Sequence, residues 1–227
     1  MKARGYTLRL SIFFFLLFTP FSSFMSILTH IYEQAHLAQI GPATLASNYV
    51  AFITSTLLAP TLSISLKKQL LMGGVAYTLN YASGIFVPLV DHSWAKFLIT
   101  CGASFVAGLS AGPLWVSQGR YIHIACVKSN ELYKKGQMYG LFTLLYCFSN
   151  VTAGFITTFG LGFFDEKVYF YVITGLGIVA MLYCLFFVPE LEQVDHPTDA
   201  RDSIIVAAES VEDSLLEETT QQSSLKP

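Results

Sequence analysis

The chain has 227 residues, of which 53% are apolar and only 12% are charged, and its formal net charge is −2. A mean hydropathy of +0.54 lies well to the apolar side of soluble domains. The charged residues are bunched, and the stretches between them are too long and too apolar for a small soluble core to hide. These numbers argue against a soluble enzyme fold and indicate an integral membrane protein.

Six stretches free of Asp, Glu, Lys and Arg are long enough to cross a bilayer, whose hydrocarbon core needs roughly 20 residues per helix. We therefore predict an all-α fold, a polytopic membrane bundle of six transmembrane helices. The predicted spans are residues 10–32, 42–66, 69–90, 97–119, 137–164 and 168–188. The first stretch also fits a signal peptide, but it runs well past that length without an Ala-x-Ala cleavage pattern, so we interpret it as a retained span.

Lysine and arginine are distributed unevenly between the two sides of these spans, and the positive-inside rule then sets the orientation. With a cytoplasmic N-terminus, the outer loops contain only Lys96 and Lys167. The inner segments contain the other basic residues of the first 188, namely Lys2, Arg4, Arg9, Lys67, Lys68, Arg120, Lys128, Lys134 and Lys135. We expect residues 1–9 to be a cytoplasmic N-terminus, residues 10–188 a six-helix domain, and residues 189–227 an acidic, disordered cytoplasmic tail.

Small residues and prolines mark the fourth span. Ser104, Gly108 and Gly112 recur at a spacing of four, which predicts a smooth ridge for helix packing. Pro113 follows directly, and Pro20 lies in the first span. If the six helices form two related triplets, as in the nested repeats of transporter halves, these prolines break the first helix of each triplet and would line a central cavity. A plain packing kink is the alternative.

No Asp, Glu, Lys or Arg lies inside the predicted spans, which argues against proton-coupled transport. Hydrogen bonds between helices, or contact with a substrate, are the two roles open to the amides at depth, Asn48, Asn80, Gln118 and Asn150. His123 and Cys126 alone do not make a zinc site, and the nucleotide-binding and hydrolase motifs are missing. We therefore expect no enzymatic activity, no metal, no cofactor and no nucleic-acid partner.

The segment from Leu114 to Tyr121 reads Leu-Trp-Val-Ser-Gln-Gly-Arg-Tyr. It resembles the Leu-Trp-x-x-Gln-Gly-x-Tyr signature of the Unc-93-like family, a branch of the major facilitator superfamily described as ion channel regulatory proteins. Residues 17–21, 58–60 and 139–142 are also similar to that family, so the resemblance covers about residues 7–188. It implies a non-enzymatic membrane protein whose signature residues, Trp115, Gln118, Gly119 and Tyr121, form an interface.

Two departures from the family pattern stand out. The family has twelve helices in two halves, whereas this chain shows six and a tail similar to the acidic linker between the halves, so we expect it to be a truncated product or to pair. The usual superfamily motif between the second and third helices is reduced here to residues 62–69, which keep Lys67 and Lys68 but lack the Asp and both glycines. Because that Asp helps to lock the two halves in ordinary transporters, alternating access is in doubt.

Three hypotheses follow. The first is an accessory protein that binds a channel or receptor in the bilayer and modulates it, with the fourth span as its contact surface. The second is a transporter of a neutral or weakly polar solute that works as a homodimer of six-helix halves. The third is a transporter-like fragment without a function of its own.

Overall fold

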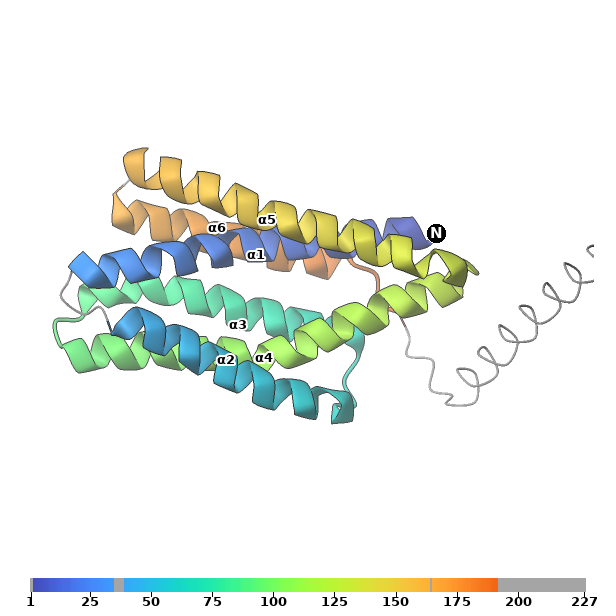
Figure 1. The fold of residues 1–227 in the computed structure, drawn as a ribbon, viewed down its shortest axis with the longest axis horizontal. Helices are drawn as coiled ribbons and strands as arrows, with labels where there is room; N and C mark the ends of the chain where they lie inside the picture. Colours follow the sequence, from blue (N-terminus) through green and yellow to red (C-terminus); the bar gives the residue numbers. More distant parts are fainter. Residues whose placement is uncertain (1, 35–38, 164, 192–227) are drawn as a thin grey trace, which may run out of the picture. The chain divides into compact units, whose positions relative to one another are not determined.

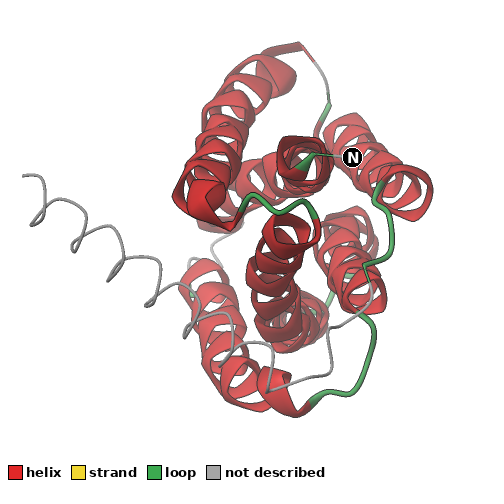
Figure 2. Ribbon diagram, turned by 90° about the vertical axis from the view of Figure 1, so that its right-hand side faces the viewer, coloured by secondary structure: helices red, strands yellow, loops and turns green. Residues whose placement is uncertain are grey.

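The computed structural model describes residues 2–34, 39–163 and 165–191. The prediction of a disordered tail falls almost wholly on residues 192–227, outside the described residues. Within the described part the secondary structure is helical, with no strand (Figure 2). The expected count of six long helices is confirmed.

The six helices run lengthwise beside one another (Figure 1). In chain order they are α1 (Ala3–Gln34), α2 (Ile40–Leu58), α3 (Leu66–Phe86), α4 (Ser93–Lys128), α5 (Lys135–Phe163) and α6 (Glu166–Phe187). Short 3₁₀ turns lie between some of them: η1 (Ala59–Thr61), η2 (Val87–Leu89) and η3 (Leu132–Lys134).

Some helix ends differ from the ends of the predicted spans, because charged residues set the bounds of those spans. The fourth span was predicted to stop before Arg120, but α4 continues to Lys128, because a basic residue ends a membrane span and not a helix. The second span was predicted to reach residue 66, but α2 ends at Leu58 and the chain turns through η1 at Pro60. Proline fixes this turn because its ring cannot continue the helical ladder.

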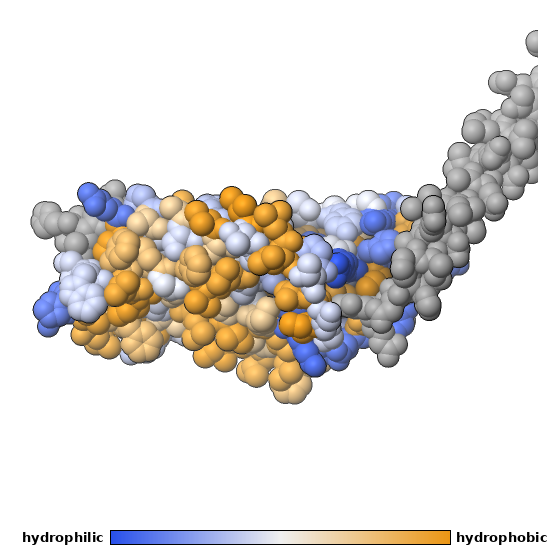
Figure 3. Space-filling view, turned by 90° about the horizontal axis from the view of Figure 1, so that it is seen from below, coloured by the Kyte–Doolittle hydropathy of each residue, from blue (hydrophilic) through white to orange (hydrophobic). Residues whose placement is uncertain are grey.

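Four stretches of the described residues are long and apolar enough to cross a membrane, namely Ala3–Leu28, Ser93–Lys128, Leu132–Gly160 and Lys167–Phe187. They belong to α1, α4, α5 and α6. On the face drawn in Figure 3, hydrophobic residues gather over the middle of the helices and hydrophilic residues lie toward their ends. The spans predicted for α2 and α3 stay predictions.

The packing of the helices repeats after three elements. α1 packs against α5 and α6, α4 packs against α2 and α3, and α3 packs against α6. Exchanging the first three helices for the last three leaves this pattern unchanged. The two triplets are therefore arranged as equivalent units around the contact between α3 and α6.

Glycines make the contact between α3 and α6 close. A Cβ added at Gly177 of α6 would run into the Tyr81 ring, and one added at Gly84 of α3 would run into the Phe170 ring. Each triplet thus offers a glycine to an aromatic side chain of the other. Tyr81 and Phe170 are buried as a result.

We expect Gly177→Val to destabilise the fold by about 2 kcal/mol, since Tyr81 must move to make room for the new side chain. The matched control is Gly175→Val on the same helix, because a Cβ at Gly175 meets nothing within 4 Å. Thermal unfolding in mild detergent compares the two variants. Equal losses of stability would contradict the close contact at Gly177.

Candidate functional site

Trp115, the first residue of the predicted signature interface, is partly buried and packs against other helices of the same chain. Its ring contacts Phe14 and Phe18 of α1, with centroids 5.3 Å away in both cases, and Tyr146 of α5 at 5.2 Å. Phe18 also contacts Tyr77 of α3 at 5.1 Å. Trp115 therefore belongs to an aromatic cluster that joins α1, α3, α4 and α5.

The rest of the signature also makes contacts within the chain. The Tyr139 hydroxyl of α5 donates to the Gly119 carbonyl at 2.8 Å, and the Tyr121 hydroxyl donates to the Pro189 carbonyl at 3.0 Å. Tyr121 is fully buried, and Gln118 is 7% exposed with no hydrogen-bond partner for its Nε2 within the described residues. The signature thus fastens α4 to α5 and to the residues that follow α6, where the sequence had suggested an interface with another protein.

The ridge of Ser104, Gly108 and Gly112 faces α2 of the same chain. A Cβ at Gly108 would run into the Asn48 carbonyl oxygen, and one at Gly112 would lie 2.5 Å from the Ser55 carbonyl carbon. The close approach of α2 and α4 therefore depends on these positions having no side chain. In this structure α2 covers the ridge, which leaves it no room for a second protein.

At this crossing a serine hydroxyl of α2 makes hydrogen bonds with two backbone groups of α4. Ser55 Oγ lies 3.0 Å from the Gly108 carbonyl oxygen and accepts a hydrogen bond from the Gly112 amide at 3.1 Å. In a regular helix these two backbone groups bond to each other. The hydroxyl thus supports α4 in the turn that precedes Pro113, whose ring removes one donor from the ladder.

Neither proline interrupts its helix, for which the sequence left two interpretations open, a break beside a cavity and a plain packing kink. α1 runs through Pro20 and α4 through Pro113, and both side chains are buried among their neighbours. Neighbouring helices and side chains can satisfy the backbone groups that proline frees. Both prolines thus lie within packed helices, and the cavity that they would line stays a prediction.

Most of the amides at depth make hydrogen bonds between helices. Asn48 Nδ2 of α2 donates to the Ser104 carbonyl of α4 at 3.1 Å, and the Ser104 hydroxyl donates to Asn80 Oδ1 of α3 at 2.8 Å. Asn150 Oδ1 of α5 accepts from the Ser22 hydroxyl of α1 at 2.7 Å. Asn48 and Asn80 are buried, whereas Asn150 is exposed.

One face of α5 is polar or small and lies open. Its residues recur at helical spacing, and all are exposed: Gly136, Gly140, Thr143, Cys147, Asn150, Gly154 and Thr158. We call this face the α5 stripe. A Cβ at any of its three glycines meets nothing within 4 Å, in contrast to Gly108 and Gly112.

The neighbouring face of α5 has a different composition. It exposes large apolar side chains suited to lipid contact, namely Leu144, Phe148, Val151, Phe155 and Phe159. The α5 stripe was not among the sites predicted from the sequence, although its spacing of three and four residues can be read directly from the sequence.

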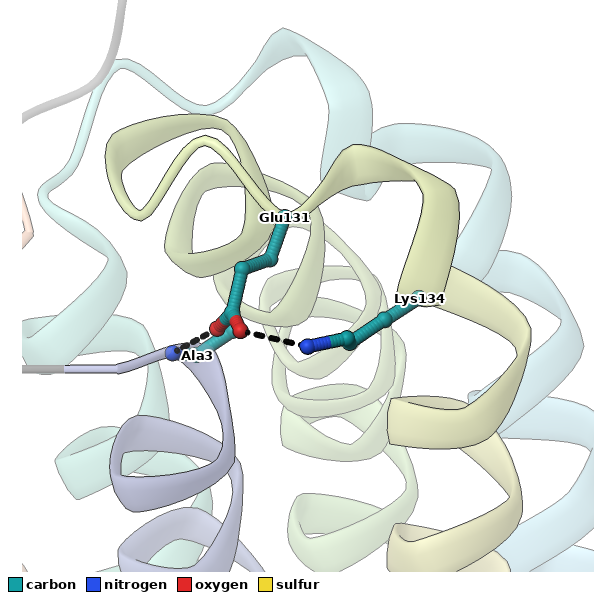
Figure 4. Close-up of polar contacts among 3 residues, drawn as sticks. All are labelled: Ala3, Glu131 and Lys134. Carbon is teal, nitrogen blue, oxygen red and sulfur yellow. Dashed lines mark hydrogen bonds and ion pairs between the residues drawn. The ribbon is translucent and has the colours of Figure 1, made fainter.

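The end of the bundle that holds most of the basic residues is tied together by polar contacts. Asn130, two residues beyond the end of α4, lies in the left-handed region at φ 52°, and the Asn130 and Glu131 amides donate to the Val127 and Cys126 carbonyls. This is a Schellman motif. It turns Glu131 toward the start of α1, where the carboxylate accepts from the Ala3 amide and from Lys134 Nζ, both at 2.9 Å (Figure 4).

The hydrogen bonds from Lys134 and then from Ala3 lower the pKa of Glu131. The contact therefore stabilises the fold at a pH above the ordinary glutamate pKa and is lost as the pH falls through the lowered value. We expect Glu131→Gln to lower the unfolding temperature at neutral pH, and we expect the difference from the wild type to shrink as the pH falls through the lowered pKa of Glu131. Thermal scans in detergent over a series of decreasing pH values measure this, and a constant difference between the proteins would contradict it.

The six helices, the four apolar spans and the charges at the helix ends define an integral, multi-pass membrane protein. Within the residues that the structure describes, no group of three or more His, Cys, Asp or Glu could hold a metal ion. No family model matches the chain. It is distantly related to protein unc-93 homolog A, which supports the resemblance found in the sequence.

The mouse homolog is 27% identical over 157 residues, which cover 66% of this chain and 32% of that relative. The cattle homolog is 28% identical over 162 residues, which cover 67% of this chain and 33% of that relative. The matched segment is thus about a third of the length of these relatives.

Proposed function

We propose that the chain is a non-enzymatic membrane protein that binds another membrane protein, a channel or a receptor, and modulates its activity or trafficking. The α5 stripe is the proposed contact surface. The observation that carries the proposal is Asn150, a carboxamide exposed near the middle of an apolar helix. Its oxygen accepts from Ser22.

An amide that faces lipid lacks the hydrogen bonds that water would provide, and leaving it unpaired is costly. A partner helix can supply those bonds. Gly136, Gly140 and Gly154 allow the backbone of such a helix to approach closely, as small residues do between helices in membranes. The ridge on α4 has no such opening, because α2 occupies it.

We further propose that all six helices cross the bilayer, with both termini in the cytoplasm, and resemble one half of a major facilitator fold. α2 has 19 residues and α3 has 21, or roughly 30 Å of helix, which matches the hydrocarbon core. The surfaces of both helices are also apolar, as shown by Ile53 at 64% and Leu79 at 58% exposure. The equivalent packing of the two triplets is typical of transporter halves.

Cross-linking through Cys147 tests the proposal, because this residue lies on the α5 stripe and is the exposed one of the four cysteines. We expect a thiol-reactive cross-linker to join Cys147 to a channel or receptor that co-purifies in a fixed ratio. Cys147→Ser should abolish the cross-link. Asn150→Leu combined with Gly154→Leu should reduce the complex several-fold, whereas the lipid-facing control Phe155→Leu should not. A complex that is unchanged in the double variant would refute the proposal.

The second candidate function is transport of a neutral or weakly polar solute by a homodimer of six-helix halves. The bond between Ser22 and Asn150 favours it, because it places polar groups on an exposed surface shared by α1 and α5. Flux of such solutes into liposomes that contain the pure chain would support transport, provided that Asn150→Leu abolishes it. A homodimer without flux would count against transport.

A further inference from the structure

An apolar groove runs between α3 and α6 and is lined by residues of these two helices. Its volume is about 520 Å³. The lining residues are Leu71, Val75, Thr78, Leu79, Ile178, Met181, Leu182 and Leu185. The only polar one, Thr78, has its hydroxyl bonded to the Gly74 carbonyl at 2.8 Å. The groove therefore offers a ligand apolar contacts alone.

With α3 and α6 crossing the bilayer as proposed above, the groove opens toward the hydrocarbon core. Val75 and Ile178 keep 46% and 52% of their surface exposed, and no charged residue lines the groove. From Leu71 to Leu79 the groove follows α3 for roughly 12 Å, a little less than the thickness of one leaflet. An acyl chain of one leaflet fits these dimensions and this chemistry.

Two lysines stand at one end of the groove. Lys67 precedes Leu71 by one turn, and its Nζ donates to the carbonyl of Leu185, another lining residue, at 2.8 Å. Lys68, the next residue, is exposed. The ion pair among the described residues joins Lys134 to Glu131. No carboxylate of the described residues therefore pairs with Lys67 or Lys68.

We propose that this groove binds an anionic phospholipid, with an acyl chain against Leu71, Val75 and Ile178 and the headgroup beside Lys67 and Lys68. The two positive charges favour an anionic headgroup. The ammonium of Lys67 has three donors, one of which bonds to the Leu185 carbonyl, so two are left for a phosphate. A basic residue near the membrane surface raises the affinity for anionic lipid about fivefold.

Native mass spectrometry of the full chain in mild detergent tests the site, with phosphatidylserine and phosphatidylcholine of identical acyl chains as probes. We expect phosphatidylserine to be retained at least several-fold more than phosphatidylcholine. Lys68→Gln should weaken phosphatidylserine binding about fivefold and leave phosphatidylcholine unchanged. Lys68 is the first choice because, unlike Lys67, it makes no bond to α6 that the fold would lose.

Two further variants separate this site from general attraction to a basic surface. Lys128→Gln removes an exposed charge at the end of α4, outside the groove, and should leave retention unchanged. Val75→Trp fills the groove and should reduce retention of both lipids. Equal retention of the two lipids, an equal loss in Lys128→Gln, or full retention in Val75→Trp would each overturn the proposal.

Discussion

Replacing Gly112 with leucine is expected to destabilise the chain by about 3 kcal/mol, the upper part of the range for overpacking. The nearest atoms to an added Cβ include the Ser55 carbonyl carbon and the Thr56 amide nitrogen, each at 2.5 Å. Both are backbone atoms of α2 and cannot rotate away from the new side chain. The Tyr81 ring, which a side chain at Gly177 would meet, can rotate. Separation of α2 from α4 also removes the bond between the Gly112 amide and Ser55 Oγ.

Gly102→Leu is the control for this substitution, because Gly102 lies on the same helix and a Cβ there meets nothing within 4 Å. Unfolding of both variants in mild detergent, followed by circular dichroism, gives the comparison. A second readout is complex size. Gly112→Leu that stays as stable as Gly102→Leu but loses association with a partner would show that the ridge binds another protein instead of α2.

The sequence predicted the elements of this fold well because bilayer insertion imposes a simple length and composition rule. Each of the six helices overlaps one of the predicted uncharged stretches, and most of the basic residues of these helices lie toward one end of the bundle. The helix ends were less predictable, because charged residues set the bounds of the predicted spans. α4 continues past Arg120, where its predicted span ended, whereas α2 stops at Leu58, before the predicted end of its uncharged stretch.

The packing partners could not be read from the sequence, because glycine spacing shows that a helix face is smooth without showing what covers it. Gly108, Gly154 and Gly177 look alike in sequence. In the structure Gly108 meets α2, Gly177 meets Tyr81, and a Cβ at Gly154 would meet nothing within 4 Å. The same limit applies to the signature, whose Tyr121 was read as an interface residue and is buried against Pro189.

Trp115→Ala should lower the free energy of unfolding by about 3 kcal/mol. The indole fills the space among Phe14, Phe18 and Tyr146, so truncation leaves a cavity bordered by three helices. We choose the low end of the range for this substitution, because a side chain that leaves the bundle enters lipid, not water, and only packing is lost. Trp115→Phe keeps part of the ring contacts and should recover part of the loss.

Trp94→Ala is the matched control, since the chain has two tryptophans and Trp94, at the start of α4, is 65% exposed. Its removal should change stability by less than about 0.5 kcal/mol. Each variant also leaves a single tryptophan, so fluorescence follows unfolding at one known position. Equal stability of the two variants would mean that the aromatic cluster does not hold α1, α4 and α5 together. That result would instead favour a role for Trp115 in binding.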